Sequence, residues 1–188
     1  MITFSKIEKS KPYSKLYEYY LNALEAGQEN IEAILIASYS IKNKEVDSRY
    51  VNLKIIKNDQ FIFFSNYNSP KAADFKDHSQ ISSVLYWPKI NVQIRMKSNI
   101  SKVPNTFSDK YFLNRDVNKN ALAISSSQSK TVKSYDQVLE NYNRSLKNNA
   151  LDIRPDYWGG YSFTPYYFEF WEGRSSRLNK RDAYKKYA

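Results

Sequence analysis

The chain has 188 residues, of which 41% are hydrophobic, and carries a formal net charge of +10. This length and apolar content suit one domain with a sizeable core and argue against a disordered tail. The chain has no cysteine and one histidine, His78. That composition excludes disulfides, thiolate nucleophiles and Cys-ligated metals, and argues against a histidine metal cluster or a Ser-His-Asp triad. Chemistry must come from lysine, arginine, tyrosine, carboxylates or a bound cofactor.

The positive charge has two explanations of about equal weight. It can reflect a polyanionic partner, such as nucleic acid, an acidic membrane surface or a phosphorylated small molecule. It can also reflect an amino-acid composition that is biased toward Lys, Asn, Ile and Tyr across the whole proteome. The basic residues are dispersed, which disfavours a polybasic arm. No apolar run approaches the roughly 18 residues of a membrane span, and residues 1–6 lead into no signal core. We therefore expect a cytoplasmic protein that contacts no membrane.

The first third of the chain predicts one helix followed by strands. Pro12 begins a stretch with helical spacing of apolar residues, and Gly27 is a plausible stop, so a helix is expected over about 12–27. The β-rich runs that follow predict strands at 34–39, 50–56 and 61–65. A turn at Asn58-Asp59 joins the last two as a hairpin.

The rest of the chain alternates helices with further strands. Ser69-Pro70 begins a short helix, and the capping-box spacing from Ser134 to Gln137 begins another, which extends to about Leu146. The remaining expected elements are strands at 81–87 and 92–103, a helix at 107–115, a long strand at 161–171 and a last strand near Ala183. The pattern predicts an α+β fold with six or more antiparallel strands in a barrel, as a single domain over residues 1–188.

Two segments place polar residues at strand positions where they could bind an anion. In residues 49–54, strand alternation puts three side chains on one face and three on the other: Arg49, Val51 and Leu53 against Tyr50, Asn52 and Lys54. Taken alone, an edge strand with solvated charges explains this segment better. In the second, Phe64-Ser65-Asn66 ends a strand and Ser69-Pro70-Lys71 opens a helix, whose free N–H groups and lysine suit an anion.

Two later segments carry amide, glycine and arginine signals. Gln93 follows Tyr86-Trp87-Pro88, and its amide could donate to and accept from a heterocycle edge, although a solvent-facing strand residue is commoner. The paired Gly159-Gly160 indicates a strained turn or a close backbone approach. Trp171 is followed by Arg177 and Arg181, an odd placement if Trp171 only fills a core.

From about Glu32 to Tyr184 the chain resembles the pyridoxamine 5'-phosphate oxidase family. Each matching piece is short, but their joint order and spacing make the match specific. The pieces are Arg49 to Lys54, Phe64-Ser65-Asn66 with Ser69-Pro70-Lys71-Ala72, Tyr86-Trp87-Pro88 with Gln93, Lys110-Tyr111-Phe112 with Arg115, Ser127-Gln128-Ser129, Trp158-Gly159-Gly160, and Glu169 to Gly173 with Arg177-Leu178 and Arg181.

The resemblance implies a split barrel that forms a homodimer and binds two FMN molecules at the subunit interface. It implies FMN phosphate and ribityl contacts from Arg49, Ser65, Lys71 and Ser129, and further flavin contacts from Val51, Asn52, Leu53, Phe64, Gln93, Gln128, Trp171 and Arg181. It assigns the substrate phosphate to Lys54, Tyr111 and Arg115, and places Arg177 over the substrate ring. The C-terminal motif spans about 157–184. The flavin would carry the redox chemistry, so no catalytic side chain or metal is expected.

Three positions depart from the family pattern. Pro70 stands where arginine usually contacts FMN, and Lys119 stands where serine usually contacts the substrate phosphate. Lysine can still bind phosphate. Asn179 replaces the usual histidine between the two terminal arginines, and it can hydrogen-bond but cannot carry a proton as imidazolium does. FMN binding is therefore better supported than the exact substrate.

Four functions remain open on the sequence alone. The leading one is oxidation of pyridoxamine 5'-phosphate or pyridoxine 5'-phosphate to pyridoxal 5'-phosphate, with dioxygen as acceptor. The second is a related FMN oxidase with another substrate, for example a phenazine precursor, which Asn179 and Pro70 favour. The third is a flavin reductase or a non-catalytic FMN-binding protein. The fourth is a nucleic-acid binder, which the basic balance alone motivates.

Overall fold

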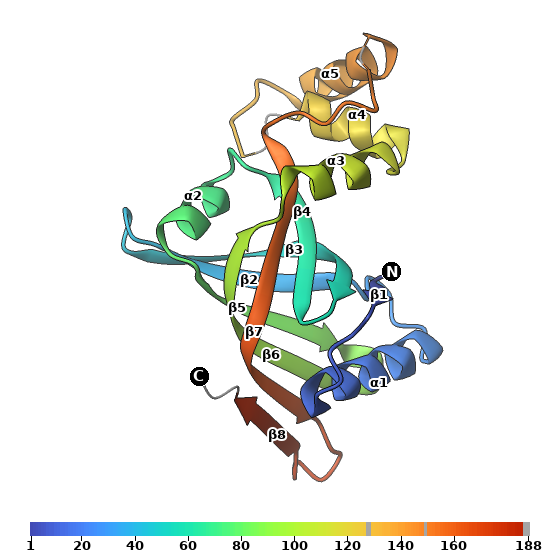
Figure 1. Cartoon of the computed structure of the whole chain (residues 1–188), viewed down its shortest axis with the longest axis vertical. Coiled ribbons are helices and arrows are strands. Elements are labelled where there is room, and N and C mark those ends of the chain that lie inside the picture. Colours follow the sequence, from blue (N-terminus) through green and yellow to red (C-terminus); the bar gives the residue numbers. More distant parts are fainter. Residues whose placement is uncertain (127–128, 149, 186–188) are drawn as a thin grey trace. The chain divides into compact units, whose positions relative to one another are not determined.

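The structure is a computed structural model that describes residues 1–126, 129–148 and 150–185 (Figure 1). These residues group into two compact units. The first comprises Met1–Phe63, Asp74–Ser101 and the described residues from Ser162 onward. The second comprises Phe64–Ala73 and the described residues of Lys102–Tyr161. The single domain expected from the sequence stays a prediction, and each unit is described by itself.

Among the described residues, six strands close into a ring, which confirms the predicted α+β barrel. The strand order β3-β2-β5-β6-β7-β4 returns to its start because β3 also pairs with β4. The pairs β2–β3, β3–β4, β2–β5 and β5–β6 are antiparallel. The strands are β2 (Ala33–Ser40), β3 (Glu45–Lys57), β4 (Gln60–Asn66), β5 (Gln80–Trp87), β6 (Val92–Lys102) and β7 (Trp158–Glu172).

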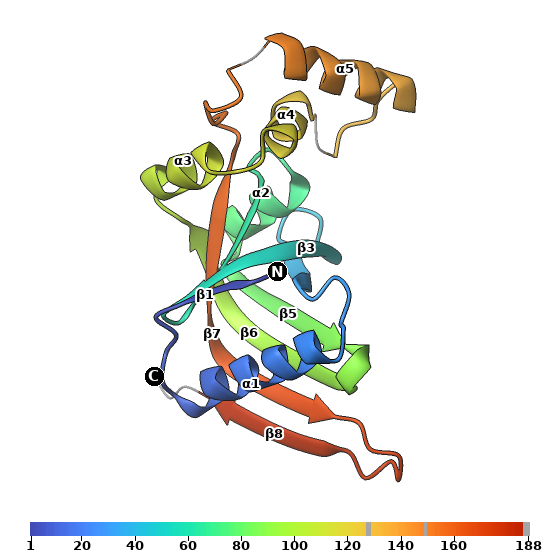
Figure 2. The ribbon, with the colours of Figure 1, turned by 90° about the vertical axis from the view of Figure 1, so that its right-hand side faces the viewer.

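Two further strands lie outside the ring. β8 (Lys180–Lys185) runs antiparallel to the C-terminal half of β7, close to where a last strand was expected (Figure 2). β1 (Thr3–Ser5) pairs with β3 in parallel and was not predicted from the sequence. With only three residues, β1 shows no alternation that could have revealed it.

The helices follow the predicted order, with one addition. They are α1 (Lys11–Glu25), α2 (Pro70–Asp77), α3 (Asn105–Leu113), α4 (Val117–Ser125) and α5 (Tyr135–Asn148), with a short 3₁₀ turn, η1, at Pro88–Ile90. Ser134 Oγ accepts from the Gln137 backbone N–H at 3.2 Å, as the capping pattern indicated. Within the described ranges, no helix is both long and apolar enough to span a bilayer.

The prediction of a helix through Arg115 was wrong, because α3 ends at Leu113. Asn114 caps it and Arg115 lies beyond the cap, so Tyr111 and Arg115 do not share one helical face. The helix α4 that follows was not predicted. Asp116 caps it by accepting from the Asn118 and Lys119 backbone N–H groups, at 3.1 and 3.2 Å. An aspartate before an apolar stretch is the signal that could have located this helix.

In the first unit, α1 packs an aromatic face onto the barrel. Tyr13 lies edge-on to Phe168 of β7 with ring centroids 5.1 Å apart, and its centroid is 6.0 Å from that of Phe61 in β4. Tyr20 meets Trp87 at the end of β5 at 6.2 Å. Phe61 is fully buried, and the other four aromatic residues are at most 5% exposed. Aromatic burial of this size dominates the energetics of such a core.

In the second unit, the N-terminal end of β7 runs very close to its neighbours. A Cβ on Gly160 would lie 2.6 Å from Val103 Cγ2, and one on Gly159 would overlap the Tyr67 hydroxyl. The missing side chain at Gly159 leaves room for the Tyr67 ring, whose Oη donates a hydrogen bond to the Gly160 carbonyl at 3.1 Å. The sequence prediction of a close backbone approach at this glycine pair is confirmed, and it lies within a strand.

Candidate functional site

In the first unit, β7 and β8 bring two of the predicted flavin residues together. Trp171 and Arg181 are direct cross-strand partners in the antiparallel ladder. Trp171 is partly buried, whereas the Arg181 side chain is 60% exposed. A half-buried indole beside an exposed guanidinium offers a ring surface and N–H donors to a planar heterocycle.

A buried carboxylate holds Arg181 in place. Glu169 of β7, with a side chain 8% exposed, forms ion pairs with Arg181 and with Arg95 of β6, the latter at 3.0 Å. The Tyr167 hydroxyl donates to the same carboxylate oxygen at 2.8 Å. Burial opposes ionisation of Glu169, but the hydrogen bonds from Tyr167, Arg181 and Arg95 outweigh it and lower its pKa. Glu169 is therefore an anion that joins three strands.

The loop between β7 and β8 carries the predicted substrate residues Arg177 and Asn179. Arg177 has a left-handed backbone, with φ of 58°, and its N–H donates to the Arg174 carbonyl at 2.9 Å. Asn179 Oδ1 accepts from the Arg174 backbone N–H at 3.1 Å. In this structure the residue that replaces the family's histidine thus shapes the loop that presents Arg177.

On β3, Arg49 is held by polar groups on two sides. Its guanidinium pairs with Asp47 at 2.6 Å and donates to Ser38 Oγ at 2.7 Å. Ser38 in turn donates to Asp74 Oδ2 at 2.8 Å. The hydrogen bond and charge of Arg49 lower the pKa of the exposed Asp47. An anion that approaches Arg49 would meet a pre-positioned cation with an exposed carboxylate beside it.

The next residues of β3 differ in exposure. Leu53 is fully buried, Val51 is partly buried and Asn52 is exposed. The β3–β4 register shifts between Leu53 and Ile55, so Lys54 lies at a β-bulge. Bulges redirect side chains, and Lys54 Nζ lies 3.3 Å from Glu32 Oε1. Gln93, half-buried on β6, lies opposite Tyr86 of β5.

In the second unit, the junction of β4 and α2 encloses a buried lysine. Lys71 is 7% exposed, and its Nζ donates to Ser69 Oγ at 3.1 Å. Ser69 Oγ donates to the Asn66 carbonyl at 2.8 Å, and Ser65 is also buried. Pro70 occupies the first helical position, which it suits because it needs no N–H partner there. An ammonium group and hydroxyls at a helix N-terminus are a donor set that suits a phosphate.

The same unit groups Phe64 and the predicted phosphate residues Tyr111 and Arg115. The rings of Phe64 and Tyr111 stack with centroids 3.7 Å apart and planes 12° apart. The Arg115 guanidinium lies over the Trp158 ring, 4.9 Å from its centroid. Burial raises the pKa of Tyr111, with Arg115 opposing, so the phenol stays protonated and can donate a hydrogen bond.

Three further predicted positions belong to the same part of the chain. Lys119 is exposed on the first turn of α4. Ser129 is exposed and left-handed, with φ of 64°. Gln128 lies outside the described residues.

Comparisons with known proteins find relatives that are similar along most of the chain. A family model described as the pyridoxine 5'-phosphate oxidase C-terminal dimerisation region matches residues 158–188. The pyridoxine/pyridoxamine 5'-phosphate oxidase of Cytophaga hutchinsonii is 37% identical over 172 residues, which cover 89% of this chain and 80% of that protein. The chain belongs to the pyridoxine/pyridoxamine 5'-phosphate oxidase family. The pyridoxine/pyridoxamine 5'-phosphate oxidase 1 of Hydrogenovibrio crunogenus is 34% identical over 181 residues, which cover 95% of this chain and 82% of that protein.

Solved structures support the same fold for this family member. The crystal structure of PhzG from Burkholderia lata, in complex with tetrahydrophenazine-1-carboxylic acid, has a TM-score of 0.86 at 24% identity and covers 95% of this chain and 88% of its own. A pyridoxamine 5'-phosphate oxidase-related, FMN binding protein from Nostoc punctiforme has a TM-score of 0.70 at 11% identity, covering 94% and 99%. At these identities the likeness shows the fold alone.

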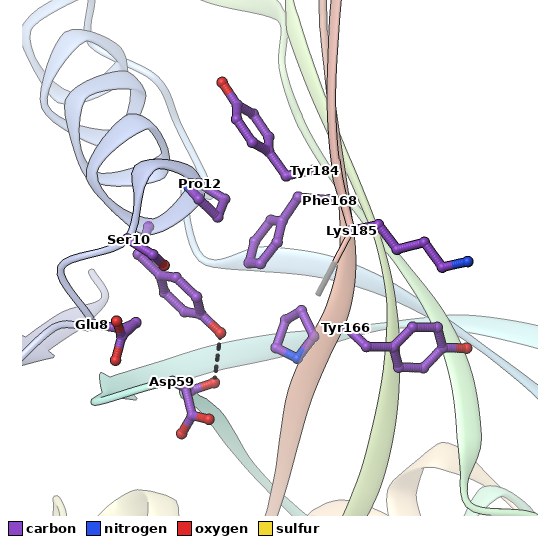
Figure 3. Close-up of a pocket in the computed structure, with 10 residues that line it drawn as sticks. Glu8, Ser10, Pro12, Asp59, Tyr166, Phe168, Tyr184 and Lys185 are labelled. Carbon is purple, nitrogen blue, oxygen red and sulfur yellow. Dashed lines mark hydrogen bonds between the residues drawn. The ribbon is translucent and has the colours of Figure 1, made fainter. Parts of the chain in front are cut away.

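A cavity in the first unit lies apart from the residues that match the family pattern. It has a volume of about 360 Å³ and is lined by α1, the β3–β4 turn, β7 and β8 (Figure 3). Tyr13 lines it and donates a hydrogen bond to the Asp59 carbonyl at 3.1 Å. None of the predicted flavin or substrate residues lines this cavity.

Sequence reasoning missed two buried polar residues that organise the predicted site residues. Glu169 was quoted as part of a motif but given no role, although a carboxylate between the aromatic residues Phe168 and Phe170 was a usable signal. Asn120, 1% exposed on α4, had no such signal because α4 itself was not predicted.

We expect Glu169→Gln to lower the free energy of unfolding at neutral pH by about 1–3 kcal/mol, because Arg95 and Arg181 lose a charged acceptor. The pKa of Glu169 is lowered from its ordinary 4.5, so the stability it provides is complete above about pH 4.5 and is lost as the pH falls through the lowered value. Urea unfolding from pH 7 down to pH 3 should therefore show a shallower acid loss in the variant.

The matched control is Glu140→Gln, on an exposed position of α5. It should leave the pH dependence close to that of the wild type. Parallel curves for wild type and Glu169→Gln would mean that the buried carboxylate is not ionised as described.

Proposed function

We propose that this chain is an FMN-dependent oxidase that converts pyridoxamine 5'-phosphate or pyridoxine 5'-phosphate to pyridoxal 5'-phosphate, with dioxygen as acceptor. The observation that carries the proposal is the similarity to oxidases of this name along nearly the whole chain, at 37% and 34% identity to two of them. We further propose that it works as a cytoplasmic homodimer, and the match of residues 158–188 to a dimerisation region supports the dimer.

The donor groups of each unit fit FMN. Buried Lys71 in the first turn of α2 and buried Ser65 near the end of β4 suit the flavin phosphate, although Pro70 supplies no second cation there. Arg49, held by Ser38, suits the same role on β3. We assign the remaining flavin contacts, following the family pattern, to Val51, Asn52, Leu53, Phe64, Gln93, Gln128, Ser129, Trp171 and Arg181.

The redox chemistry would be supplied by bound FMN, with a hydride leaving the substrate carbon and dioxygen reduced to hydrogen peroxide; with pyridoxamine 5'-phosphate, one water is also consumed and ammonia is released. The side chains then need only bind and orient. Tyr111, kept protonated by burial, donates to the substrate phosphate, and Arg115 and Lys119 supply positive charge, with Lys54 as a further cation. Arg177 lies in the loop that Asn179 stabilises and would cover the substrate ring.

A second candidate is a related FMN oxidase that acts on another substrate. The observation that favours it is the state of Asn179, whose amide oxygen is engaged with the Arg174 backbone N–H and cannot take the imidazolium role of the usual histidine. Assays of pyridoxine 5'-phosphate and a phenazine precursor side by side distinguish the two candidates.

The purified protein should be yellow and should release FMN on denaturation. The donor set has phosphate-binding groups but the sequence has no glycine-rich dinucleotide fingerprint, so FAD is not expected. Chromatography of the released flavin identifies it. Recovery of FAD, or of no flavin after reconstitution with FMN, would refute the cofactor assignment.

Replacing Arg115 with alanine should weaken binding of pyridoxal 5'-phosphate roughly ten- to a hundredfold. A charge-assisted hydrogen bond contributes about 1.5–3 kcal/mol, and each 1.4 kcal/mol is about tenfold in affinity. FMN binding should stay nearly unchanged. Titration calorimetry measures the first with FMN-loaded protein and pyridoxal 5'-phosphate, and the second with flavin-free protein and FMN.

The matched control is Arg144→Ala, which removes the same charge from an exposed position on α5. It should bind pyridoxal 5'-phosphate as the wild type does. If Arg115→Ala and Arg144→Ala bind equally well, Arg115 does not bind the substrate phosphate.

A further inference from the structure

Arg115 is held between a neutral amide and an aromatic face. It follows the end of α3, where its backbone N–H donates to the Phe112 carbonyl at 3.1 Å. Its Nη1 donates to Asn120 Oδ1 at 3.4 Å, and its guanidinium carbon lies 4.9 Å from the centre of the Trp158 ring. Both contacts are with neutral groups. The nearby carboxylate of Asp116 acts on Arg115 through its charge, but it accepts hydrogen bonds from the Asn118 and Lys119 backbone N–H groups.

The orientation of the Asn120 amide is fixed by its other hydrogen bonds. Asn120 is 1% exposed, and its Nδ2 donates to the Phe112 carbonyl at 3.0 Å and the Leu151 carbonyl at 2.8 Å. Two carbonyl oxygens can only accept, so the NH₂ group must face them and Oδ1 must face Arg115. The amide therefore offers Arg115 an acceptor that cannot rotate away.

Trp158 is equally constrained. It is 6% exposed, its ring stacks with Phe64 at a centroid distance of 5.2 Å and an interplanar angle of 9°, and Phe112 contacts it edge-on at 5.1 Å. The indole cannot tilt without displacing these rings. Its face thus provides a fixed surface for the guanidinium, which aromatic faces attract more strongly when water is excluded.

We propose that Asn120 and Trp158 are positioning residues for Arg115, which they hold so that its remaining N–H donors face a substrate phosphate. This inference rests on the proposed function, in which Arg115 binds that phosphate. An arginine loses substantial side-chain freedom when it binds an anion, and a residue that is already held loses less. Asn120 engages one of the five N–H donors of the guanidinium, which leaves the others for the ligand.

The test is a double-mutant cycle read out with two ligands, pyridoxal 5'-phosphate and pyridoxal, which lacks the phosphate. Trp158→Leu, Arg115→Ala and the double variant are titrated as FMN-loaded full-length proteins. Trp158→Leu should weaken pyridoxal 5'-phosphate binding about three- to tenfold with Arg115 present, and less than about twofold without it. Pyridoxal binding should change little in either background.

Trp158→Phe is the conservative variant, because it keeps an aromatic face and should retain most of the affinity for pyridoxal 5'-phosphate. Asn120→Ala takes the place of Trp158→Leu in the cycle if the leucine variant does not fold, because it removes the hydrogen-bond acceptor of Arg115. For each variant, the quantity compared is the ratio of affinities for the two ligands, which a general loss of structure would not change selectively.

Equal losses from Trp158→Leu with and without Arg115 would overturn the positioning role while leaving the proposed function intact. So would an unchanged ratio of affinities in both Trp158→Leu and Asn120→Ala. Failure of the proposed function is distinct, because the wild type would then bind neither ligand, or would bind both equally. That result would remove the basis of the inference as well.

Discussion

The pairing of β3 with β4 is the constraint on which the rest of the first unit depends. Without it, β3 and β4 would be the two ends of an open sheet; with it, the ring closes and those strands lose their free edges. The bulge in this pairing places Lys54 out of the regular ladder, beside Glu32. The same strand carries Arg49 in the part that pairs with β2, opposite Ile36. One strand of the ring thus carries two cations that the family pattern assigns to phosphates.

The predicted phosphate-binding and flavin-binding cations have different kinds of contact in the two units. In the first unit the arginines rest on carboxylates, Arg49 on Asp47 and Arg181 on Glu169. In the second, Lys71 contacts a serine hydroxyl, and Arg115 contacts an amide and an indole. A carboxylate orients an arginine but reduces its pull on an anion, whereas a neutral partner orients it and leaves the charge available. For Arg115, the neutral contacts agree with a phosphate-binding role.

Local patterns in the sequence predicted most of the fold. Runs rich in β-forming residues located the barrel strands, the serine at 134 marked the start of α5, and the glycine pair at 159–160 indicated the close approach found in β7. The resemblance supplied the candidate residues, but not their partners. Those partners come from elsewhere in the chain. Glu169 of β7 forms an ion pair with Arg95 of the neighbouring strand β6, and Asn120 donates a hydrogen bond to the Leu151 carbonyl. Such pairings depend on tertiary packing, which no local pattern encodes.

The ends of the helices were the other feature that the sequence predicted poorly. A helix through Arg115 looked continuous because apolar and long side chains run to that point, but Asn114 ends α3 and Asp116 starts α4. That break is what turns Arg115 toward Trp158 and Asn120. A single misjudged helix end therefore concealed the arrangement that gives Arg115 its place in the proposed site.

In the proposed function, bound FMN takes electrons from a phosphorylated pyridoxine or pyridoxamine substrate. The most direct measurement mixes FMN-loaded protein with pyridoxamine 5'-phosphate in the absence of oxygen and follows the visible absorption of the flavin. If the proposed function is correct, the flavin absorption bleaches and then returns on admission of air, with pyridoxal 5'-phosphate and hydrogen peroxide formed in equal amounts. Flavin that stays oxidised with this substrate and with pyridoxine 5'-phosphate, yet is reduced by dithionite, would contradict it.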